Sequence, residues 1–388
     1  MKKLVFVLLT FLYSAMLLSQ DFKILCGPYL QGVTDNEVTV VWVTSKEAVS
    51  WVELAPDDGT HFYAEERPQF YQTNFGKKEI ATLHKIRISG LQKATKYRYR
   101  IYSKEVTAKE HFYIGYGKTA ATNVYSKKPL TFRTLDSSQP SMKFAMVNDI
   151  HENSELLEKL ISRIKVNEQD FVLFNGDMVS NMFSEKQILD GFVNQAVRSF
   201  ASEIPFFMAR GNHETRGLFS TEYINYFPTP TGQPYYTFRQ GPAFFIVLDG
   251  GEDKPDTDIE YHGLAHFDSY RENQTKWLAG VLQSEEFKQA PVKVVVMHVP
   301  PVRSTWHGPI QVKKHFIPLL NEAGIHLMLS AHTHKHFYVE AGNEDCNFPI
   351  LINSNKDIVE FDITERQISF KVLSGEGGSV LTKTLTIR

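Results

Sequence analysis

Hydrophobic and polar residues alternate along the first third of the chain. Between residues 25 and 134, apolar side chains recur at every second position, and turn-forming pairs such as Asp58-Gly59 and Ser89-Gly90 separate the runs. A period of two is typical of half-buried β-strands. No stretch in this part has helical spacing, so the pattern predicts a domain built of strands over residues 21–135.

Short strands separated by frequent turns favour a β-sandwich of immunoglobulin or fibronectin type III architecture. Trp42 is the expected core residue between its two sheets. The histidines of this part, His61, His84 and His111, lie apart from one another and from any carboxylate cluster. We expect them to be surface or core residues, and we expect the polar segment 135–141 to be a linker.

From residue 142 to residue 388, apolar runs alternate with amphipathic segments. The predicted strands are 143–147, 171–174, 205–208, 244–248, 292–297, 326–329, 350–352, 358–363, 368–373 and 380–387. The predicted helices are 154–164, 186–200 and 272–282. This alternation indicates a second domain of the α/β class.

Side chains that can bind a metal follow five of the predicted strands. In chain order they are Asp149 and His151, then Asp177, then Asn212 with His213, then His298, and finally His332 with His334. Ligands bind open α/β sheets at the carboxyl ends of the strands. So many buried carboxylates and imidazoles at one edge would be costly without cations to pair with them. The pattern therefore predicts a metal site at this edge.

The chemistry of the donors narrows the choice of metal. Nitrogen and oxygen ligands without a thiolate suit zinc, iron, manganese or cobalt. Two cations ~3.5 to 4 Å apart need a carboxylate that bridges them. Asp177 is the natural candidate for this bridge, because it lies on the central one of the five loops.

The same residues resemble the signature of the calcineurin-like metallophosphoesterase superfamily, which is D-x-H, G-D, G-N-H-[DE], H and G-H-x-H. The matching blocks, all within residues 142–388, are Asp149-Ile150-His151, Gly176-Asp177, Gly211-Asn212-His213-Glu214, His298 and Ala331-His332-Thr333-His334. The resemblance implies a central β-sandwich flanked by helices and a site for two metal ions.

The resemblance also implies a role for each residue. Asp149, His151 and His334 would bind one metal, Asn212, His298 and His332 the other, and Asp177 would bridge them. His213 would bind no metal and would face the substrate oxygen, with Glu214 as a candidate partner that orients it.

The order of the two domains is similar to that of the purple acid phosphatases, and Gly27-Pro28-Tyr29-Leu30 followed by Val40-Val41-Trp42 resembles the start of their first domain. Two positions depart from that group. Ser180 stands where those enzymes have a tyrosine, and His151 stands where they have a glycine. We therefore expect a colourless protein without a tyrosinate-to-iron chromophore.

Composition agrees with a globular enzyme. With 388 residues, 42% of them hydrophobic and 22% charged, the chain is long enough for two or three packed domains and is neither disordered nor a multi-span membrane protein. Its net charge of -2 argues against a general nucleic-acid-binding surface, which would need an excess of basic groups. Two divalent cations would nevertheless make the pocket locally positive.

The expected reaction is hydrolysis of a small-molecule phosphate ester. A hydroxide that bridges the metals would attack phosphorus in line, and His213 would protonate the leaving oxygen as a general acid or hydrogen-bond the phosphate. Glu214, Arg303 and His307 are weaker candidates for substrate contacts. Residues 250–271 lack periodicity and are expected to form a loop over the site or on the surface.

The chain begins with a pattern typical of a secretory signal peptide. Residues 1–20 place Lys2 and Lys3 before an apolar run of 15 residues, which is too short to span a membrane as a helix. We therefore expect a cleaved leader, no permanent anchor and a periplasmic or secreted protein. In such a compartment Cys26 and Cys346 could pair, although two buried thiols are the favoured expectation.

The function predicted from the sequence is that of a two-metal phosphomonoesterase. A phosphodiesterase or nucleotide pyrophosphate hydrolase would use the same residues, and the motifs do not separate these activities. A non-catalytic binding protein is the alternative from another class, but such relics usually lose a ligand, and all seven positions are filled here. The physiological substrate, the oligomeric state and the role of the sandwich stay open.

Overall fold

The structure is a computed structural model that describes residues 21–387. The predicted signal peptide, residues 1–20, lies outside the described residues. Within the described part, no helix has the length and apolar character needed to cross a membrane.

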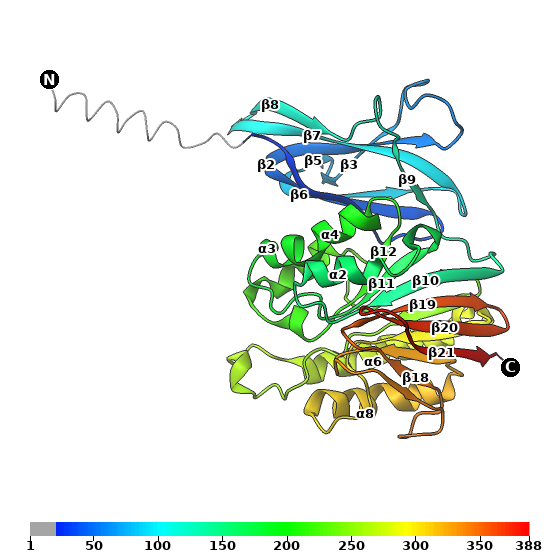
Figure 1. The fold of residues 1–388 in the computed structure, drawn as a ribbon. Helices are drawn as coiled ribbons and strands as arrows, with labels where there is room; N and C mark the ends of the chain where they lie inside the picture. The colour runs from blue at the N-terminus through cyan, green and yellow to red at the C-terminus, as the bar shows by residue number, and fades with distance from the viewer. Residues whose placement is uncertain (1–20, 388) are drawn as a thin grey trace.

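The first domain is a β-sandwich, as the alternating pattern predicts (Figure 1). Its main sheet contains β1 (Ile24–Gln31), β2 (Glu37–Pro56), β3 (Gln69–Tyr71), β6 (Ile80–Ser89), β7 (Lys96–Glu110), β8 (Tyr113–Ala121) and β9 (Leu130–Arg133). A small hairpin of β4 (Thr73–Asn74) and β5 (Lys77–Lys78) is attached to it.

Strand β2 links the two layers of this sandwich. Its first half pairs with β1 and β6, whereas its second half pairs with β3 and β7, and the register shifts between Val43 and Ala48. The sequence predicts two separate strands here because the alternation breaks at this shift. Trp42 is fully buried between the layers, as expected, and its indole N–H donates to Ser103 Oγ at 2.8 Å.

The second domain contains two six-stranded sheets packed face to face. The first sheet has the order β12 (Phe206–Ala209), β11 (Phe171–Asn175), β10 (Ser141–Val147), β19 (Asp357–Thr364), β20 (Gln367–Ser374) and β21 (Ser379–Thr386). The second has the order β13 (Tyr236–Gln240), β14 (Ala243–Val247), β15 (Val292–Val296), β16 (Leu327–Ser330), β18 (Ile350–Ile352) and β17 (Phe337–Val339). The sequence pattern does not predict β13 or β17.

Strands β10, β11 and β12 are parallel, and so are β14, β15, β16 and β18. Because neighbouring parallel strands end at the same edge of their sheet, the loops after β10, β11 and β12 lie together, and so do the loops after β15 and β16. The two sheets pack face to face, and this packing brings both sets of loops together. The predicted strand ends therefore meet in space.

Helices cover the outer face of each sheet. The first sheet is covered by α2 (Ser154–Ile161) and by a continuous helical segment made of α3 (Glu185–Ile188), η2 (Leu189–Val193), α4 (Asn194–Ala196) and η3 (Val197–Ala201). The second is covered by α6 (Phe267–Gln283), α7 (Glu285–Gln289) and α8 (His307–Glu322). The predicted helices 154–164, 186–200 and 272–282 are present, whereas α8, which contains Pro318, is not predicted.

The remaining helical turns are short and lie in loops. They are η1 (Val166–Glu168), η4 (His213–Thr215), η5 (Leu218–Glu222), α5 (Tyr223–Tyr226) and η6 (Ile259–Tyr261). Residues 250–271, expected to form a loop, contain η6 and the first turn of α6 and are otherwise irregular.

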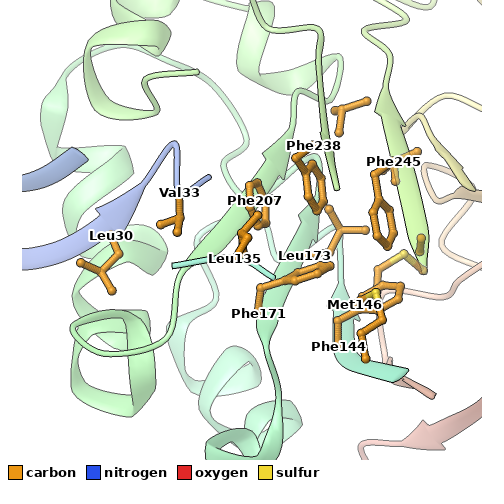
Figure 2. Close-up of a cluster of buried hydrophobic side chains, with 14 of the residues drawn as sticks. Leu30, Val33, Leu135, Phe144, Met146, Phe171, Leu173, Phe207, Phe238 and Phe245 are labelled. Carbon is orange, nitrogen blue, oxygen red and sulfur yellow. The ribbon is translucent and has the colours of Figure 1, made fainter. Parts of the chain in front are cut away.

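One hydrophobic core runs through both domains. Phe144, Phe171 and Phe245 interlock between the two sheets, and Leu30 and Val33 of the sandwich belong to the same cluster (Figure 2). Figure 1 shows the sandwich against the side of the second domain that carries α3 and α4, away from α6 and α8.

Polar contacts along β1 complete the interface between the domains. Tyr29 Oη donates to the carbonyl of Tyr226 at 3.0 Å, Gln31 Nε2 donates to Phe206 at 3.0 Å, and Ser202 donates to Pro28 at 2.8 Å. Tyr29 is fully buried. The sandwich is therefore packed against the second domain through shared core and hydrogen bonds.

The two cysteines are free and buried, which agrees with the favoured expectation of two thiols. Cys26 lies in the core beneath the helices of the first sheet, whereas Cys346 lies in the core beneath those of the second sheet. The alternative of a disulfide between them is therefore not realised in this structure. Burial raises the pKa of the Cys26 thiol to about 12.

Candidate metal centre

The candidate ligands stand on loops that directly follow β10, β11, β12, β15 and β16. Backbone hydrogen bonds bind these loops to one another. The N–H groups of Asp149 and His151 donate to the carbonyls of Gly176 and Asp177 at 2.9 and 3.0 Å, and the Ala331 N–H donates to the carbonyl of His298 at 2.9 Å. The side chains are thus positioned by a connected backbone rather than by independent loops.

The backbone is strained at five of the seven candidate ligands. Positive φ angles between 47° and 69° occur at Asp149, His151, Asp177, His332 and His334. Such angles are uncommon for residues with a side chain, and they concentrate at functional sites, where the surrounding structure maintains them. Their concentration here marks this edge as the functional one.

The first candidate group contains Asp149, His151 and His334, whose ligand atoms lie close enough to hold one ion. His334 Nε2 is 3.2 Å from Asp149 Oδ1 and 3.2 Å from His151 Nε2. Asp149 is 1% exposed, so water does not neutralise its charge. The three residues come from two loops that are 183 positions apart in the chain.

The second candidate group contains Asp177, His298 and His332. His298 Nε2 lies 2.9 Å from Asp177 Oδ2, and its Nδ1 lies 2.7 Å from the carbonyl of Asn175, which fixes the orientation of the ring. Nδ1 is therefore the protonated nitrogen, and Nε2 faces the site. Asn212 joins this group, since its amide oxygen lies 3.0 Å from His332 Nδ1.

The pKa values of the two histidines in the second group are shifted in opposite directions. Burial lowers the pKa of His298, but the carboxylates of Asp177 and Asp149 outweigh it and raise the pKa to about 10. Burial lowers the pKa of His332 to about 4, which leaves its ring in the neutral form that binds metals. A cation between Asp177 and His298 would take the place of the shared proton.

Several polar atoms of the site fit a bound cation. Asp149 Oδ1 is buried and accepts no hydrogen bond of good geometry in the described structure, where its neighbour is His334 Nε2 at 3.2 Å, although buried polar atoms are rarely left without one. The Asn212 amide can satisfy its neighbours when its nitrogen donates to His332 Nδ1 at 3.0 Å and to Asp177 Oδ2 at 3.3 Å. A cation would instead hold the amide oxygen inward. The donor set of nitrogen and oxygen atoms thus suits a transition metal or zinc.

His213 lies beside both groups and is held by two contacts. Its backbone N–H donates to Asp177 Oδ1 at 2.9 Å, and its Nδ1 lies 2.8 Å from the carbonyl of Ser180. Nε2 therefore points into the site, 4.0 Å from Asp177 Oδ2. Ser180, which stands where the purple acid phosphatases have a tyrosine, contributes its backbone carbonyl to this arrangement.

Glu214 neither orients His213 nor lines the pocket, so this expectation is wrong. The side chain is 1% exposed, and Oε2 accepts from the N–H groups of Asp177 and Gly211, each at 2.9 Å. Oε1 accepts from Met178 at 2.7 Å and from Val179 at 3.3 Å. Burial raises the pKa of Glu214 to about 7, the charge of Asp177 adds to this rise, and the N–H donors oppose it. Glu214 thus fastens the loop after β12 to the loop after β11.

Two glycines permit this close approach of the loops. A Cβ atom on Gly211 would lie 2.2 Å from Asp177 Oδ1 and 2.5 Å from the Asp177 nitrogen. A Cβ atom on Gly176, where φ is +80°, would lie 2.5 Å from the ring of His298. The glycines of the G-D and G-N-H-E blocks are therefore required because any side chain at these positions would overlap a candidate ligand.

The weaker candidates are placed outside the two candidate groups. His307, at the start of α8, lies 2.9 Å from both carboxylate oxygens of Asp268. Arg303 stacks on Phe337, with 4.6 Å from the guanidinium carbon to the ring centre, and lies 3.8 Å from Glu344. Each side chain thus has a local structural partner, which sequence spacing does not reveal.

Arg216 is a neighbour of the site that the motifs do not reveal. Its Nη1 lies 3.3 Å from His213 Nε2, and its guanidinium pairs with Glu252 at 2.9 Å and with Asp253 at 3.4 Å. The acidic partners follow β14, which carries none of the motifs. The only signal in the sequence is that Arg216 lies three residues after His213, and this alone does not predict the pairing.

Family models match both halves of the chain. A calcineurin-like phosphoesterase model matches residues 142–336, which include all seven candidate ligands. A model of the purple acid phosphatase N-terminal domain matches residues 28–114. The first model thus covers half of the chain, and the second covers most of the sandwich.

A curated relative and several solved structures are also similar. The serine/threonine-protein phosphatase CPPED1 of Mus musculus is 23% identical over 212 residues. The match covers 52% of this chain and 63% of the relative. The chain therefore spans less than two thirds of the length of this relative.

Among solved structures, a predicted phosphoesterase from Streptococcus pneumoniae TIGR4 is 12% identical, with a TM-score of 0.32, over 64% of this chain and 99% of its own. Vacuolar Protein Sorting 29 from Cryptosporidium parvum is 9% identical, with a TM-score of 0.33, and the match covers 63% of this chain and 98% of that protein. TM-scores at this level carry no argument about function.

Proposed function

The chain belongs to the calcineurin-like phosphoesterase family, and we propose that it is a metal-dependent hydrolase of phosphate monoesters. The observation that carries the proposal is the convergence of Asp149, His151 and His334 with Asp177, His298 and His332 at one edge of the second domain. The mouse relative is named a serine/threonine-protein phosphatase, and phosphoserine and phosphothreonine are monoesters. This favours monoesters over the phosphodiesters that the motifs leave open.

The proposed ligand sets are those that the motif predicts. Asp149, His151 and His334 would hold one ion, and the other would be held by His298 and His332 with the amide oxygen of Asn212. Asp177 would serve both, because one of its carboxylate oxygens lies 2.9 Å from His298 Nε2 and its carboxylate also lies close enough to His151 to share an ion with it. Two divalent ions held in this way would supply activation of the attacking water and neutralisation of phosphoryl charge.

The remaining demand is a proton for the departing oxygen, and we assign it to His213. The contact between Nδ1 and the Ser180 carbonyl at 2.8 Å leaves Nε2 as the ring nitrogen that faces the site. Histidine is the most common general acid of proteins. The backbone N–H of His213, which donates to Asp177 Oδ1 at 2.9 Å, holds the residue beside the proposed bridging ligand.

A substrate screen tests the proposal. Protein reconstituted with Mn²⁺, Zn²⁺, Co²⁺ or Fe²⁺ is assayed on p-nitrophenyl phosphate, bis(p-nitrophenyl) phosphate and nucleoside diphosphates and triphosphates. We expect the highest kcat/KM for the monoester and a loss of activity in Asp177→Asn. A clear preference for the diester would overturn the choice of monoester, and an active Asp177→Asn protein would show that hydrolysis occurs elsewhere.

We further propose that the protein works in the periplasm or outside the cell. The proposal is supported by the basic start and the apolar run within residues 1–20. Expression of the full chain, followed by cell fractionation and mass determination of the mature protein, tests it. Recovery of uncleaved chain from the cytoplasm would contradict the proposal.

A further inference from the structure

A cavity of about 680 Å³ opens next to the candidate metal centre. One wall is formed by residues that follow the G-N-H-E block, and the other by the irregular segment 250–271. The lining side chains used in this argument are Phe183, Arg216, Leu218, Tyr261, Leu264 and Phe267. A volume of this size is typical of a small-molecule site and exceeds what a phosphate group alone would fill.

Arg216 connects the cavity to the proposed general acid. It lines the cavity, and its Nη1 lies 3.3 Å from His213 Nε2. Thr215 also lines the cavity, and its hydroxyl lies 2.7 Å from the carbonyl oxygen of Asn212 and 2.7 Å from Glu252 Oε1, to one of which it donates. A phosphoryl group at the metal centre, with its leaving oxygen at His213, would therefore direct the rest of the molecule into the cavity.

Large apolar side chains surround the opening. Phe183 is 67% exposed, Leu218 is 85% exposed and Leu264 is 76% exposed. Tyr261 and Phe267 stand deeper on the same wall, with ring centres 6.4 Å apart. Exposed apolar residues that gather around a cavity mark a binding site, whereas single ones are common on any surface. The cavity therefore favours an apolar group.

The charged side chains of the cavity are already paired. Among the described residues that line it, Arg216 is neutralised by Glu252 and Asp253, and Arg210 by Asp249 at 2.6 Å. The carboxylate of Glu260 pairs with Lys254. No unpaired lysine or arginine is left among these lining residues to bind a second phosphate. A nucleoside polyphosphate, which would need such a group, therefore does not suit the cavity.

We infer that the cavity receives the uncharged aromatic or bulky apolar alcohol portion of a phosphate monoester. The inference rests on the proposed function and adds the class of leaving group. It assigns Leu218 and Leu264 to the recognition of that group, with Phe183 beside them. Substrate discrimination would thus come from the segment 250–271 and the loop after β12, and not from the metal ligands.

Two esters with leaving groups of similar basicity isolate this effect. Benzyl phosphate and ethyl phosphate differ mainly in the ring, so a difference in kcat/KM reports binding of the ring in the transition state. We expect benzyl phosphate to be preferred about 10-fold, which corresponds to about 1.4 kcal/mol. Leu218→Ser and Leu264→Ser should each lower this ratio about 3-fold, and the double variant should bring it near one.

Val380→Ser is the matched control, because Val380 is 48% exposed on β21, far along the chain from the cavity segments. Its ratio should equal that of the unmodified protein. Since Leu218 and Leu264 are exposed, their replacement should not disturb folding, and circular dichroism checks this.

Binding of 2-naphthol to protein without added metal provides a second measurement that is independent of hydrolysis. Its affinity should fall at least 5-fold in the double variant Leu218→Ser, Leu264→Ser and should not change in Val380→Ser. Equal rates on the two esters, or naphthol binding that the double variant leaves unchanged, would overturn the inference and leave the proposed function standing. Absence of hydrolysis of every ester, with naphthol binding still sensitive to the double variant, would overturn the proposed function alone.

Discussion

The buried carboxylate of Glu214 accepts a hydrogen bond from the backbone N–H of Asp177 at 2.9 Å. Glu214 also accepts a hydrogen bond from the backbone N–H of Gly211, three positions before it. It therefore links the loop after β12 to the loop that carries Asp177, the proposed bridging ligand. Glu214 therefore helps to position Asp177, together with the backbone N–H groups of His151 and His213 that donate to it.

Glu214→Gln is therefore expected to weaken both folding and metal binding. In the variant, the amide nitrogen of the glutamine would face backbone N–H groups that now donate to a carboxylate oxygen of Glu214. A buried donor without an acceptor lowers the free energy of unfolding by ~1 to 3 kcal/mol. Loss of a group that orients a metal ligand typically lowers metal affinity ~10- to 100-fold. Urea unfolding and metal titration measure the two effects, with Glu260→Gln, an exposed carboxylate, as the control. Unchanged metal affinity would contradict the proposed role.

Gly211→Ala is expected to abolish hydrolysis and to destabilise the protein by more than ~1 kcal/mol, because the added Cβ would overlap the carboxylate and backbone of Asp177. Gly280→Ala is the matched control. Nothing lies within 4 Å of a Cβ at Gly280, which is inside α6, so the same change should stabilise by ~0.5 to 1 kcal/mol. Thermal unfolding of both variants tests the contrast, and an active Gly211→Ala enzyme would show that the loops can separate without loss of the site.

His213→Ala should slow benzyl phosphate hydrolysis far more than hydrolysis of p-nitrophenyl phosphate, because the nitrophenolate leaves without a proton. General acid catalysis is typically worth ~10²- to 10⁴-fold, and this range is the expected loss for the poor leaving group. The ratio of kcat/KM values for the two esters is the measurement. Equal losses on both esters would remove the acid role and leave His213 as a phosphate-binding group.

Metal addition should stabilise the folded protein. A ligand present at 100 times its Kd adds ~2.7 kcal/mol to the free energy of unfolding, and Asp149 Oδ1 would gain a partner. We expect Mn²⁺ or Zn²⁺ to raise Tm in the unmodified protein and to have a smaller effect on Asp177→Asn. Asp362→Asn, an exposed position on β19, should respond like the unmodified protein. Equal stabilisation of Asp177→Asn would contradict its assignment as a ligand.

The sandwich should lose stability in acid through His84. Burial lowers the pKa of His84 from 6.5 to about 3, and its Nε2 lies 3.0 Å from Thr44 Oγ1. Between these two pKa values the unfolded chain binds a proton that the folded chain does not, so stability falls as the pH falls from about 6.5 toward 3.

His84→Gln removes this linkage, and its free energy of unfolding relative to the unmodified protein should improve by ~2 kcal/mol between pH 7 and pH 4.5. Urea unfolding at the two pH values measures the difference. If the two proteins keep a constant difference across this range, His84 does not carry the acid sensitivity.

Local sequence patterns were sufficient for most of the elements, although not for β13, β17 or α8, and for most of the candidate site. The period of two around Val38, Val40 and Trp42 predicts the strand that the structure contains, because alternation directly reports which side chains face a core. The ligand positions follow in part from the same logic, since neighbouring parallel strands end at one edge of their sheet. Asp149 and Asp177, which follow β10 and β11, could therefore be grouped before any distance was known. His298 follows β15 of the second sheet, and packing of the two sheets brings it to Asp177.

The tertiary structure decided what the remaining polar residues do. Glu214 and His213 are adjacent in the chain, yet the carboxylate is buried under Asp177 and the ring faces the site. Arg216 pairs with Glu252 across 36 positions, and the cavity arises where residues after β12 meet the segment 250–271. Periodicity shows which side chains of one helix or strand are buried, but it does not show which side chains from distant parts of the chain contact one another. The sequence itself thus determined where the strands end. The contacts of Glu214, Arg216 and the cavity residues were determined only by the packing of the whole chain.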